Sequence, residues 1–520
     1  LGSGYTTDKR PLYANADGAS LIYRGAARLE LGQDNGDGAF SVRPVPQTYT
    51  IGPTGATALA LVRGGKGSVL RLSDRMNSGN PIGSANGNKV FVNGGIETRE
   101  DGLVLAPVFG SRAYKMNFLK YDETNGFTEF GDADYATALD AGADKVVKIS
   151  GTATTLSSDA TIAGLRLDYA ENKPLTIAEG ATLTVGDGVH PAAIILNTVY
   201  ATSTLSWTAI NGAGAIDFGA SEGLLVKPER QHGDYDAPPV VSAAIHGRNG
   251  LTVVGDNLSQ NPMLYLSGAN DYAGGTFIDM IEVRASGASP FGAGPVTVRG
   301  RRINGGAAAF GSARTYTNDF VITGYGRNYD CFRSYYASGA LHFRTSGTVL
   351  AGNVRVDEYA RISATDAASN AVNTISGVIS GGDLQFIYGA AAGKKIVLEG
   401  HNTLTVDGQP HSVTGDVHVA SIRDGDQPEA ILDLSPLYPD GVSAYRRGRL
   451  ERDGFTLSDV LTGLGSGSSV TWRMLTRAKA RIEGESVVLE QGGRTLTLSR
   501  NVPEGASSWQ LEQAPHGAEW

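Results

Sequence analysis

The stretch LYLSGANDYAGGTFIDMIEVRASGASPFGAGPVTV, residues 264–298, decides the fold of this chain. At its start apolar and polar residues alternate, so a short strand can bury one of its sides. Glycines and prolines then recur where the chain must turn, and β-branched residues follow each turn. The stretch therefore predicts a coil of short extended segments joined by tight corners, without a helix.

The same residues resemble a repeat found in passengers of bacterial autotransporters and in very large bacterial surface proteins. The usual form of this repeat is Leu-x-Leu-x-Gly-x-Asn-x-Tyr-x-Gly-Gly-Thr-x-Ile, followed by a Gly-rich corner and a Gly-Pro-Val-x-Val strand. The matching residues are Leu264, Leu266, Gly268, Asn270, Tyr272, Gly274, Gly275, Thr276, Ile278, Gly294, Pro295, Val296 and Val298. The resemblance implies a parallel β-solenoid that is secreted or displayed on a bacterial cell surface.

A second, partial copy of the unit follows later in the chain. Residues 244–251 lead into residues 264–270, and residues 377–384 lead into residues 396–402 in the same way. After Asn402 the run Thr-Leu-Thr replaces the expected Tyr-x-Gly-Gly, so the corner geometry of the second copy stays open. The repetition predicts that both copies contribute strands to one architecture.

Apolar clusters recur most regularly between residues 147 and 226, at a spacing of roughly 8 to 12 residues. Three such strands would make one coil of roughly 20 to 30 residues, which is in the range of solenoid repeats. We therefore expect an all-β fold: an elongated, right-handed parallel β-helix, or β-solenoid, with atypical capping regions at both ends.

This fold predicts three regions. Residues 1–146 would form degenerate N-terminal β coils with an aromatic-rich excursion, residues 147–423 the regular β-solenoid, and residues 424–520 a C-terminal cap or assembly region. Two short helical segments are also expected, one or two turns within residues 132–148 and an amphipathic helix near residues 445–452. We interpret the aromatic side chains of residues 102–131 as a packed plug in a lateral excursion, in preference to a ligand platform.

Composition narrows the possible functions. Glycine is frequent, with 70 of 520 residues, but has no Gly-x-y period, which excludes collagen. The formal net charge of −9 gives no electrostatic footprint for nucleic acid, so a nucleic-acid partner is not expected. A stretch of about 18 apolar residues is absent, so we expect no membrane insertion within these residues. Because Cys331 is the only cysteine, an intrachain disulfide cannot form.

Possible catalytic groups are few and scattered. Asp234 with Asp236, and Asp424 with Asp426 and Glu429, could pair as carboxylates, but both groups lie in turn-rich stretches beside proline and read as solvated loops. No HExxH, GxSxG or complete phosphate-loop motif is present. The histidines have no metal-ligand spacing; they are His190, His232, His246, His342, His401, His411, His418 and His516. We therefore assign no catalytic, cofactor or metal residues and expect no cofactor.

Two features keep binding functions open. Cys331 lies in the aromatic run YGRNYDCFRSYY, residues 325–336, and we interpret it as a buried, inert thiol. The aromatic rings of this run could stack on sugar rings, although stacking between coils is an equally physical explanation.

The leading hypothesis is a non-enzymatic extracellular structural or adhesive protein that self-associates end to end or by strand addition. Residues 1–13 and 507–520 are candidate donor strands. The alternatives are a polysaccharide-active β-helix enzyme, either a lyase or a glycosidase, and an adhesin that binds surface glycans.

Overall fold

The structure is a computed structural model of the chain, and almost all of its regular elements are strands. Within the described part of the chain there is no α-helix, so the expectation of an all-β fold is confirmed. The described residues include the 3₁₀ turns Asp132–Asp134 and Ser435–Leu437. The structure describes residues 21–31, 48–52, 55, 60–73, 80–112, 115–198, 206–228, 238–255, 263–300, 305–327, 338–364, 367–387, 394–398, 404–409, 418–452, 454–474, 476, 478–500 and 508–511.

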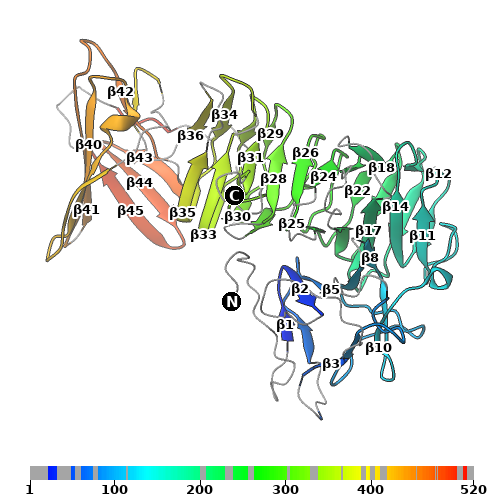
Figure 1. Cartoon of the computed structure of the whole chain (residues 1–520). Coiled ribbons are helices and arrows are strands. Elements are labelled where there is room, and N and C mark those ends of the chain that lie inside the picture. Colours follow the sequence, from blue (N-terminus) through cyan, green and yellow to red (C-terminus); the bar gives the residue numbers. More distant parts are fainter. Residues whose placement is uncertain are drawn as a thin grey trace.

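The first ten strands form a unit with its own apolar core, which we call the N-terminal unit (Figure 1). Its early pairs are parallel, β1 with β4, β2 with β5, β5 with β7, and β3 with β6, whereas the later pairs β7–β8 and β9–β10 are antiparallel. The strands are β1 (Leu21–Tyr23), β2 (Ala26–Glu30), β3 (Thr48–Ile51), β4 (Leu61–Arg63), β5 (Val69–Ser73), β6 (Lys89–Val92), β7 (Val108–Arg112), β8 (Lys115–Asn117), β9 (Leu119–Asp122) and β10 (Gly126–Glu129).

The centre of the chain, from β11 to β36, winds into stacked parallel strands, and we call it the parallel stack. Most of these strands belong to one 18-stranded sheet, in which all the described pairs are parallel. One face stacks β11 (Val146–Ser150), β14 (Gly164–Tyr169), β17 (Ala192–Thr198), β20 (Gly223–Lys227), β23 (Leu251–Gly255), β25 (Thr276–Asp279), β27 (Val296–Arg299), β30 (Phe320–Gly324), β33 (Val354–Ser363) and β35 (Ile379–Ile387).

The second face of the same sheet alternates with the first along the chain, and smaller parallel sheets close a third side. The second face contains β12 (Thr154–Leu156), β15 (Leu175–Ile177), β18 (Trp207–Asn211), β21 (Pro239–Val241), β24 (Met263–Leu266), β26 (Glu282–Ala285), β28 (Ala307–Phe310) and β31 (Leu341–Phe343). The third side contains β13 (Ala160–Ile162), β16 (Thr182–Val185), β19 (Ala215–Asp217) and β22 (Ala244–His246), then β29 (Thr315–Tyr316), β32 (Val349–Leu350), β34 (Val372–Ile375) and β36 (Lys395–Leu398).

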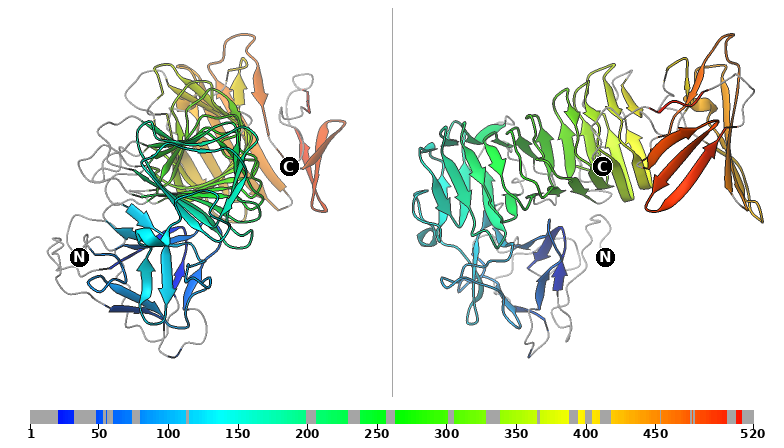
Figure 2. Two further views of the ribbon diagram at one scale, coloured as in Figure 1. Left: turned by 90° about the vertical axis from the view of Figure 1, so that its right-hand side faces the viewer. Right: turned by 180° about the vertical axis from the view of Figure 1, so that it is seen from behind.

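One apolar core fills the stack from end to end. The buried cluster begins at Leu139 and ends at Ile396, and residues of successive turns meet in register inside it. Val253 lies beside Ile278, which lies beside Val298, so the inward-facing residue of each strand rests on that of the next. The apolar clusters predicted between residues 147 and 226 fall on β13 to β20, three strands to a turn. Figure 2 shows the resulting elongated body from behind and, in its left panel, nearly along its length.

The glycine and asparagine positions of the decisive stretch form the corners between turns. Asn270 is buried, and its Oδ1 accepts the Ile245 N–H at 2.9 Å while its Nδ2 donates to the Pro290 carbonyl at 2.8 Å. The side chain thus joins its own turn to the turns before and after it. Gly274 packs so closely that a Cβ there would lie 2.3 Å from the carbonyl carbon of Asn249. Close stacking of the turns therefore requires glycine at this corner.

Beyond the stack the pairing changes. The last parallel pair is β34 with β36, and every described pair from residue 404 onward is antiparallel. Residues 399–403, which include the divergent corner of the second motif copy, lie outside the described residues. The strands are β37 (Leu404–Val406), β38 (His418–Arg423), β39 (Glu429–Asp433), β40 (Ser443–Glu451), β41 (Gly454–Thr462), β42 (Val470–Trp472), β43 (Lys479–Glu483), β44 (Ser486–Gln491) and β45 (Arg494–Ser499).

Of the two predicted helical segments, the first is present only as a single 3₁₀ turn and the second is absent. The segment 132–148 contains only the 3₁₀ turn Asp132–Asp134 before β11 begins. The amphipathic helix expected near residues 445–452 is wrong, because these residues lie mostly in β40. β40 has partners on both sides, and Arg446 pairs with Asp459 of β41 while Arg447 pairs with Glu429 of β39. These cross-strand pairs outweigh a helix propensity that Gly448 already weakens.

Candidate functional site

The structure describes three of the five carboxylates proposed from the sequence. Asp424 and Asp426 are exposed in the turn between β38 and β39. Glu429 is ion-paired with Arg447 and lies 3.6 Å from Arg423. Asp234 and Asp236 lie outside the described residues. Among the residues that the structure places, no cluster of three or more His, Cys, Asp or Glu side chains could hold a metal ion.

The described histidines have separate local partners. His190 lies between Asp187, 2.6 Å from its Nδ1, and Glu97, 3.1 Å from its Nε2. The Nδ1 atom of His246 is 2.5 Å from Asp271, and His342 is fully buried. The other positions are not described at the level of the side chain: His232, His401, His411, His418 and His516.

The aromatic run is described only at its start. Cys331 and the tyrosines of residues 328–337 lie outside the described part, so their predicted roles stay predictions. Tyr325 is described, and the Arg361 guanidinium lies over its ring at 3.9 Å. The ring of Tyr359 meets the ring of Tyr325 edge-on at 5.5 Å. An arginine and two tyrosines thus gather beside β33.

A buried charge cluster on the second face was not anticipated from the sequence. Glu282 is fully buried, and its Oε1 accepts a hydrogen bond from Arg284 Nε at 2.6 Å. Arg327 and Arg344 approach the same carboxylate to 3.6 and 3.8 Å. Burial raises the pKa of Glu282 and the surrounding cations lower it more strongly, to about 2. Arg284 also donates to the hydroxyl of Tyr265, so the cluster carries an aromatic ring beside its arginines.

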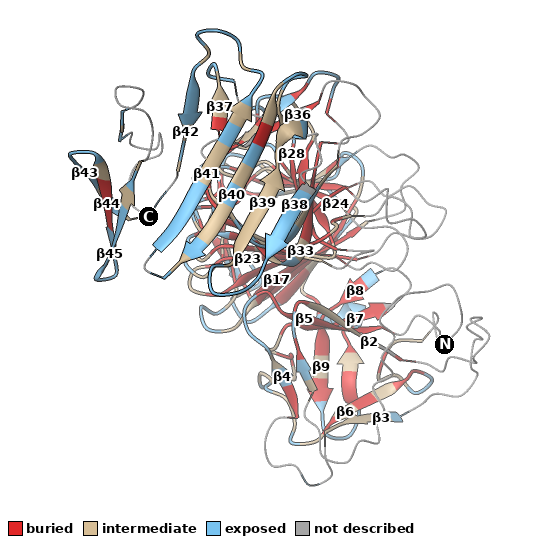
Figure 3. Cartoon of the chain, turned by 90° about the vertical axis from the view of Figure 1, so that its left-hand side faces the viewer, coloured by how far each residue is buried: buried red, intermediate tan, exposed pale blue. Residues whose placement is uncertain are grey.

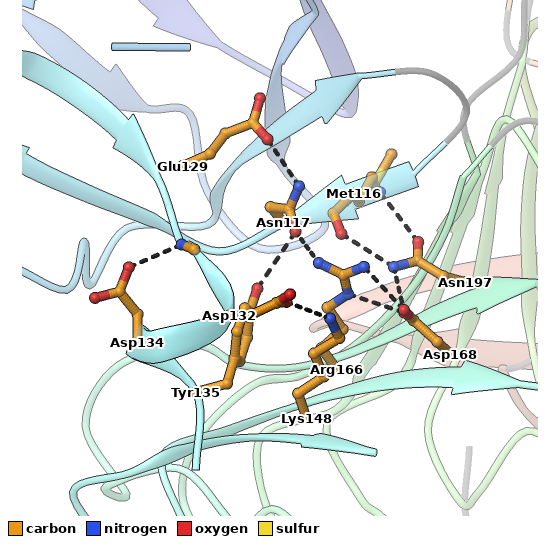
Figure 4. A network of polar contacts seen from close by, with 11 residues as sticks. Met116, Asn117, Glu129, Asp132, Asp134, Tyr135, Lys148, Arg166, Asp168 and Asn197 are labelled. Carbon is orange, nitrogen blue, oxygen red and sulfur yellow. Dashed lines mark hydrogen bonds and ion pairs between the residues drawn. The ribbon is translucent and has the colours of Figure 1, made fainter. Parts of the chain in front are cut away.

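The N-terminal unit lies against the flank of the parallel stack and is joined to it by a polar network (Figure 4). On β14 of the stack, Arg166 and Asp168 form two parallel hydrogen bonds of 2.8 and 2.9 Å. The side-chain amide of Asn197 in β17 bonds to the backbone of Met116 in β8: its Oδ1 accepts the Met116 N–H at 3.0 Å, and its Nδ2 donates to the Met116 carbonyl oxygen at 3.1 Å. Arg166 also donates to Asn117, the residue after Met116.

An apolar layer extends this junction. Buried side chains from both bodies form one cluster, in which Phe109, Phe118 and Phe130 of the N-terminal unit meet Ile195 and Val226 of the stack. The aromatic block of residues 102–131 therefore contributes to packing at this junction.

Further along the flank, Glu222 accepts hydrogen bonds from the Gly67 N–H at 3.0 Å and from Thr252 at 2.5 Å. The guanidinium of Arg63 lies 2.8 Å from the same carboxylate. Since Gly67 and Arg63 belong to the N-terminal unit, this charged contact holds it to the start of β20, the strand that stacks on β17.

A largely exposed surface lies at the other end, on the sheet of β38, β39, β40 and β41, which we call the C-terminal sheet (Figure 3). Several large apolar side chains on it are exposed, Ile422 by 69% and Phe455 by 63%. Leu450 pairs with Phe455 and Gly448 with Leu457 across β40 and β41, and Ile422 pairs with Ala430 across β38 and β39. Because residues directly opposite each other share a face, these side chains form a partly apolar surface.

Comparisons with known proteins identify no similar protein. No family model, no curated protein and no solved structure matches the chain. In the described part of the chain, no helix has both the length and the apolar character needed to span a membrane.

Proposed function

We propose that this chain is a non-enzymatic structural or adhesive protein of the bacterial exterior, secreted or held at the cell surface. In this proposal the parallel stack is a right-handed β-solenoid that acts as a stiff column. The observation that carries the proposal is the single apolar core that runs from Leu139 to Ile396 without a break. A core that is renewed at every turn gives the chain length and stiffness.

The corner chemistry supports the relation to autotransporter-type repeats. Each polar position of the motif has a structural task, since Asn270 bonds to neighbouring turns and the Tyr272 hydroxyl lies 2.8 Å from that of Thr276. Thr276 in turn donates to the Phe291 carbonyl at 2.9 Å. A motif that makes such bonds favours stacked coils in any protein that carries it. The motif therefore supports the architecture directly, and the bacterial exterior only through the resemblance.

Self-association is the second part of the proposal, and the C-terminal sheet supports it. Isolated surface apolar residues need no explanation, but Ile422, Leu450, Phe455 and Leu457 lie together on one face of one sheet. Their exposure on one face of this sheet favours a partner. The parallel stack thus holds the N-terminal unit at its flank and the C-terminal sheet at its end.

The test is to image the full chain by electron microscopy and to measure its mass by light scattering over a wide concentration range. Elongated particles that associate as concentration rises are expected. Particles that stay compact and monomeric under every condition would contradict the proposal.

Glycan binding is a second candidate function, favoured by the arginine and tyrosine pairs on the stack. Arg361 covers Tyr325, and Arg284 both donates to Tyr265 and lies over its ring at 5.3 Å. Aromatic faces and guanidinium groups are suited to sugar rings and their carboxylates. A glycan array, followed by assays for reducing ends and unsaturated products, separates the adhesin from the polysaccharide-active enzyme. If the chain binds no glycan and releases no product from any glycan, both alternatives are excluded.

A further inference from the structure

Strand β41 forms one edge of the C-terminal sheet. β41 is nine residues long, Gly454–Thr462, and in the described part of the chain it pairs on one side only, with β40. Most of its residues are exposed. A strand at a sheet edge presents a row of unpaired N–H and C=O groups, which is a template for another strand.

β41 lacks the features by which proteins protect such edges. Its sequence GFTLSDVLT contains no lysine, arginine or proline, and it pairs with β40 over nine residues without a register shift. The opposite edge of the same sheet, β38, has a register shift between Val419 and Ser421 and carries Arg423. Bulges and charged side chains discourage edge pairing, so β38 is the protected edge and β41 is the open one.

The charge on β41 is suited to contact between identical chains. Asp459 is its only charged residue, and Arg446 holds its carboxylate through two hydrogen bonds of 2.7 and 2.9 Å. The whole chain carries a net charge of −9, so most surfaces of two copies would repel each other. Along β41 this repulsion is locally compensated.

We propose that β41 pairs antiparallel with β41 of a second copy, so that two C-terminal sheets join across a twofold axis. This proposal rests on the self-association proposed above and names the surface that carries it. A twofold contact uses the same strand from both copies. Only a register centred on Ser458 pairs all nine residues of each strand, and it sets Ser458 against Ser458 and Phe455 against Leu461 of the second copy.

In this arrangement the apolar face of one sheet continues into the other. Phe455 and Leu457 lie on the strand at the axis, with Leu450 and Ile422 further from it. Directly opposite residues of antiparallel strands have Cα atoms about 4.5 to 5.5 Å apart, which is within disulfide range. A cysteine at position 458 should therefore lie opposite the same cysteine of the second copy, close enough to form a disulfide.

The experiment uses the full chain with Cys331→Ser, so that no native thiol remains, and adds Ser458→Cys. Mild oxidation should give a disulfide-linked dimer on a non-reducing gel. Two matched variants provide the controls. Ser421→Cys places the same change on the protected edge β38, and Thr456→Cys lies on β41 but faces Val460 of the second copy, so both should cross-link far less.

A third variant tests the contact without cross-linking. Ser458→Lys brings two like charges together at the axis and should raise the dissociation constant of the dimer by about tenfold or more, with an unchanged circular dichroism spectrum. If the chain associates but Ser458→Cys cross-links no better than Ser421→Cys, and Ser458→Lys has no effect, the β41 contact is wrong while self-association stands. If the chain stays monomeric at every concentration, both are wrong.

Discussion

Arg166 and Asp168 lie two residues apart on β14 and form a buried bidentate ion pair, with side chains only 8% and 4% exposed. Both point outward from the core of the parallel stack, toward the N-terminal unit. A charged pair is buried on the outer face of a strand only if another body covers it. The pair therefore marks the place where the N-terminal unit and the stack are joined.

Asp168→Asn is expected to loosen this junction. It removes the charge while keeping the shape of the side chain, and it leaves the Arg166 guanidinium buried without its anion. Breaking a buried pair in this way costs about 3 to 5 kcal/mol. Urea unfolding followed by the fluorescence of aromatic residues measures the loss. Asp132→Asn is the control, because its ion pair with Lys148 is largely exposed and should change stability by less than about 1 kcal/mol.

Asn270→Ala tests the corner bonds of the stack. The substitution leaves the Ile245 N–H and the Pro290 carbonyl without the side chain that each now contacts. An orphaned buried polar group costs about 1 to 3 kcal/mol, and here two are affected. Asn249 is a matched control, since its amide donates only to the Ala220 carbonyl and is partly buried. Equal losses for Asn270→Ala and Asn249→Ala would show that the motif asparagine has no special role.

Gly274→Ala should be more damaging than its size suggests. The new methyl group would lie 2.3 Å from a backbone carbon of Asn249, so the turns would have to move apart. Gly131→Ala is the control, because the nearest atom there is 3.7 Å away on a side chain and the position needs no left-handed backbone. We expect a lowered melting temperature and faster amide exchange in β23 and β25 for Gly274→Ala alone. Similar behaviour of both variants would contradict close stacking at this corner.

Glu282 should make stability depend on acid pH. Burial alone would raise its pKa above the ordinary value of 4.5, but the neighbouring charges lower the pKa by more, to about 2. These neighbours are Arg327, His342, Arg284 and Arg344. A lowered pKa in the folded state gives stability that is complete above pH 4.5 and is lost as the pH falls toward 2. The free energy of unfolding should therefore decline over this window in the natural chain. In Glu282→Gln the decline should be smaller, and an unchanged decline would exclude Glu282 as its source.

His190 should act in the opposite direction. Burial lowers its pKa, but the hydrogen bonds to Asp187 and Glu97 raise it by more, so the folded-state pKa lies above 6.5. Stability from this contact is complete below pH 6.5 and is lost as the pH rises through the folded-state value. Because Glu97 belongs to the N-terminal unit, amide exchange of that unit should increase slightly across this range. His190→Gln should remove the pH dependence, and its persistence would contradict this assignment.

The sequence predicts the parallel stack well because each turn repeats the same local rule. Inward apolar residues such as Ile194 and Leu196 alternate with outward ones, and glycines such as Gly274 appear where the turns touch. Within one turn, the alternating apolar residues and the corner glycine lie within a few residues of each other. The strands of residues 147–226 could therefore be placed without any knowledge of distant contacts.

Other features depend on distant partners and left no local signal. Asn197 meets Met116 from 81 residues away, and Glu282 meets cations from two later strands or loops, Arg327 and Arg344. The prediction of a helix near residues 445–452 is wrong for the same reason. Arg446 and Arg447 have helix-compatible propensities, and only their partners Asp459 and Glu429 favour a strand.

The central claim is that the parallel strands stack turn upon turn into one column, and a distance measurement tests it most directly. Spin labels at Ser150→Cys in β11 and Arg355→Cys in β33, in the Cys331→Ser chain, are separated by eight strand-to-strand steps along the first face. At about 4.8 Å a step, pulsed electron paramagnetic resonance should give roughly 40 Å. The distance should shorten when the second label moves to Thr297→Cys in β27, and a distance that stays the same would contradict the column.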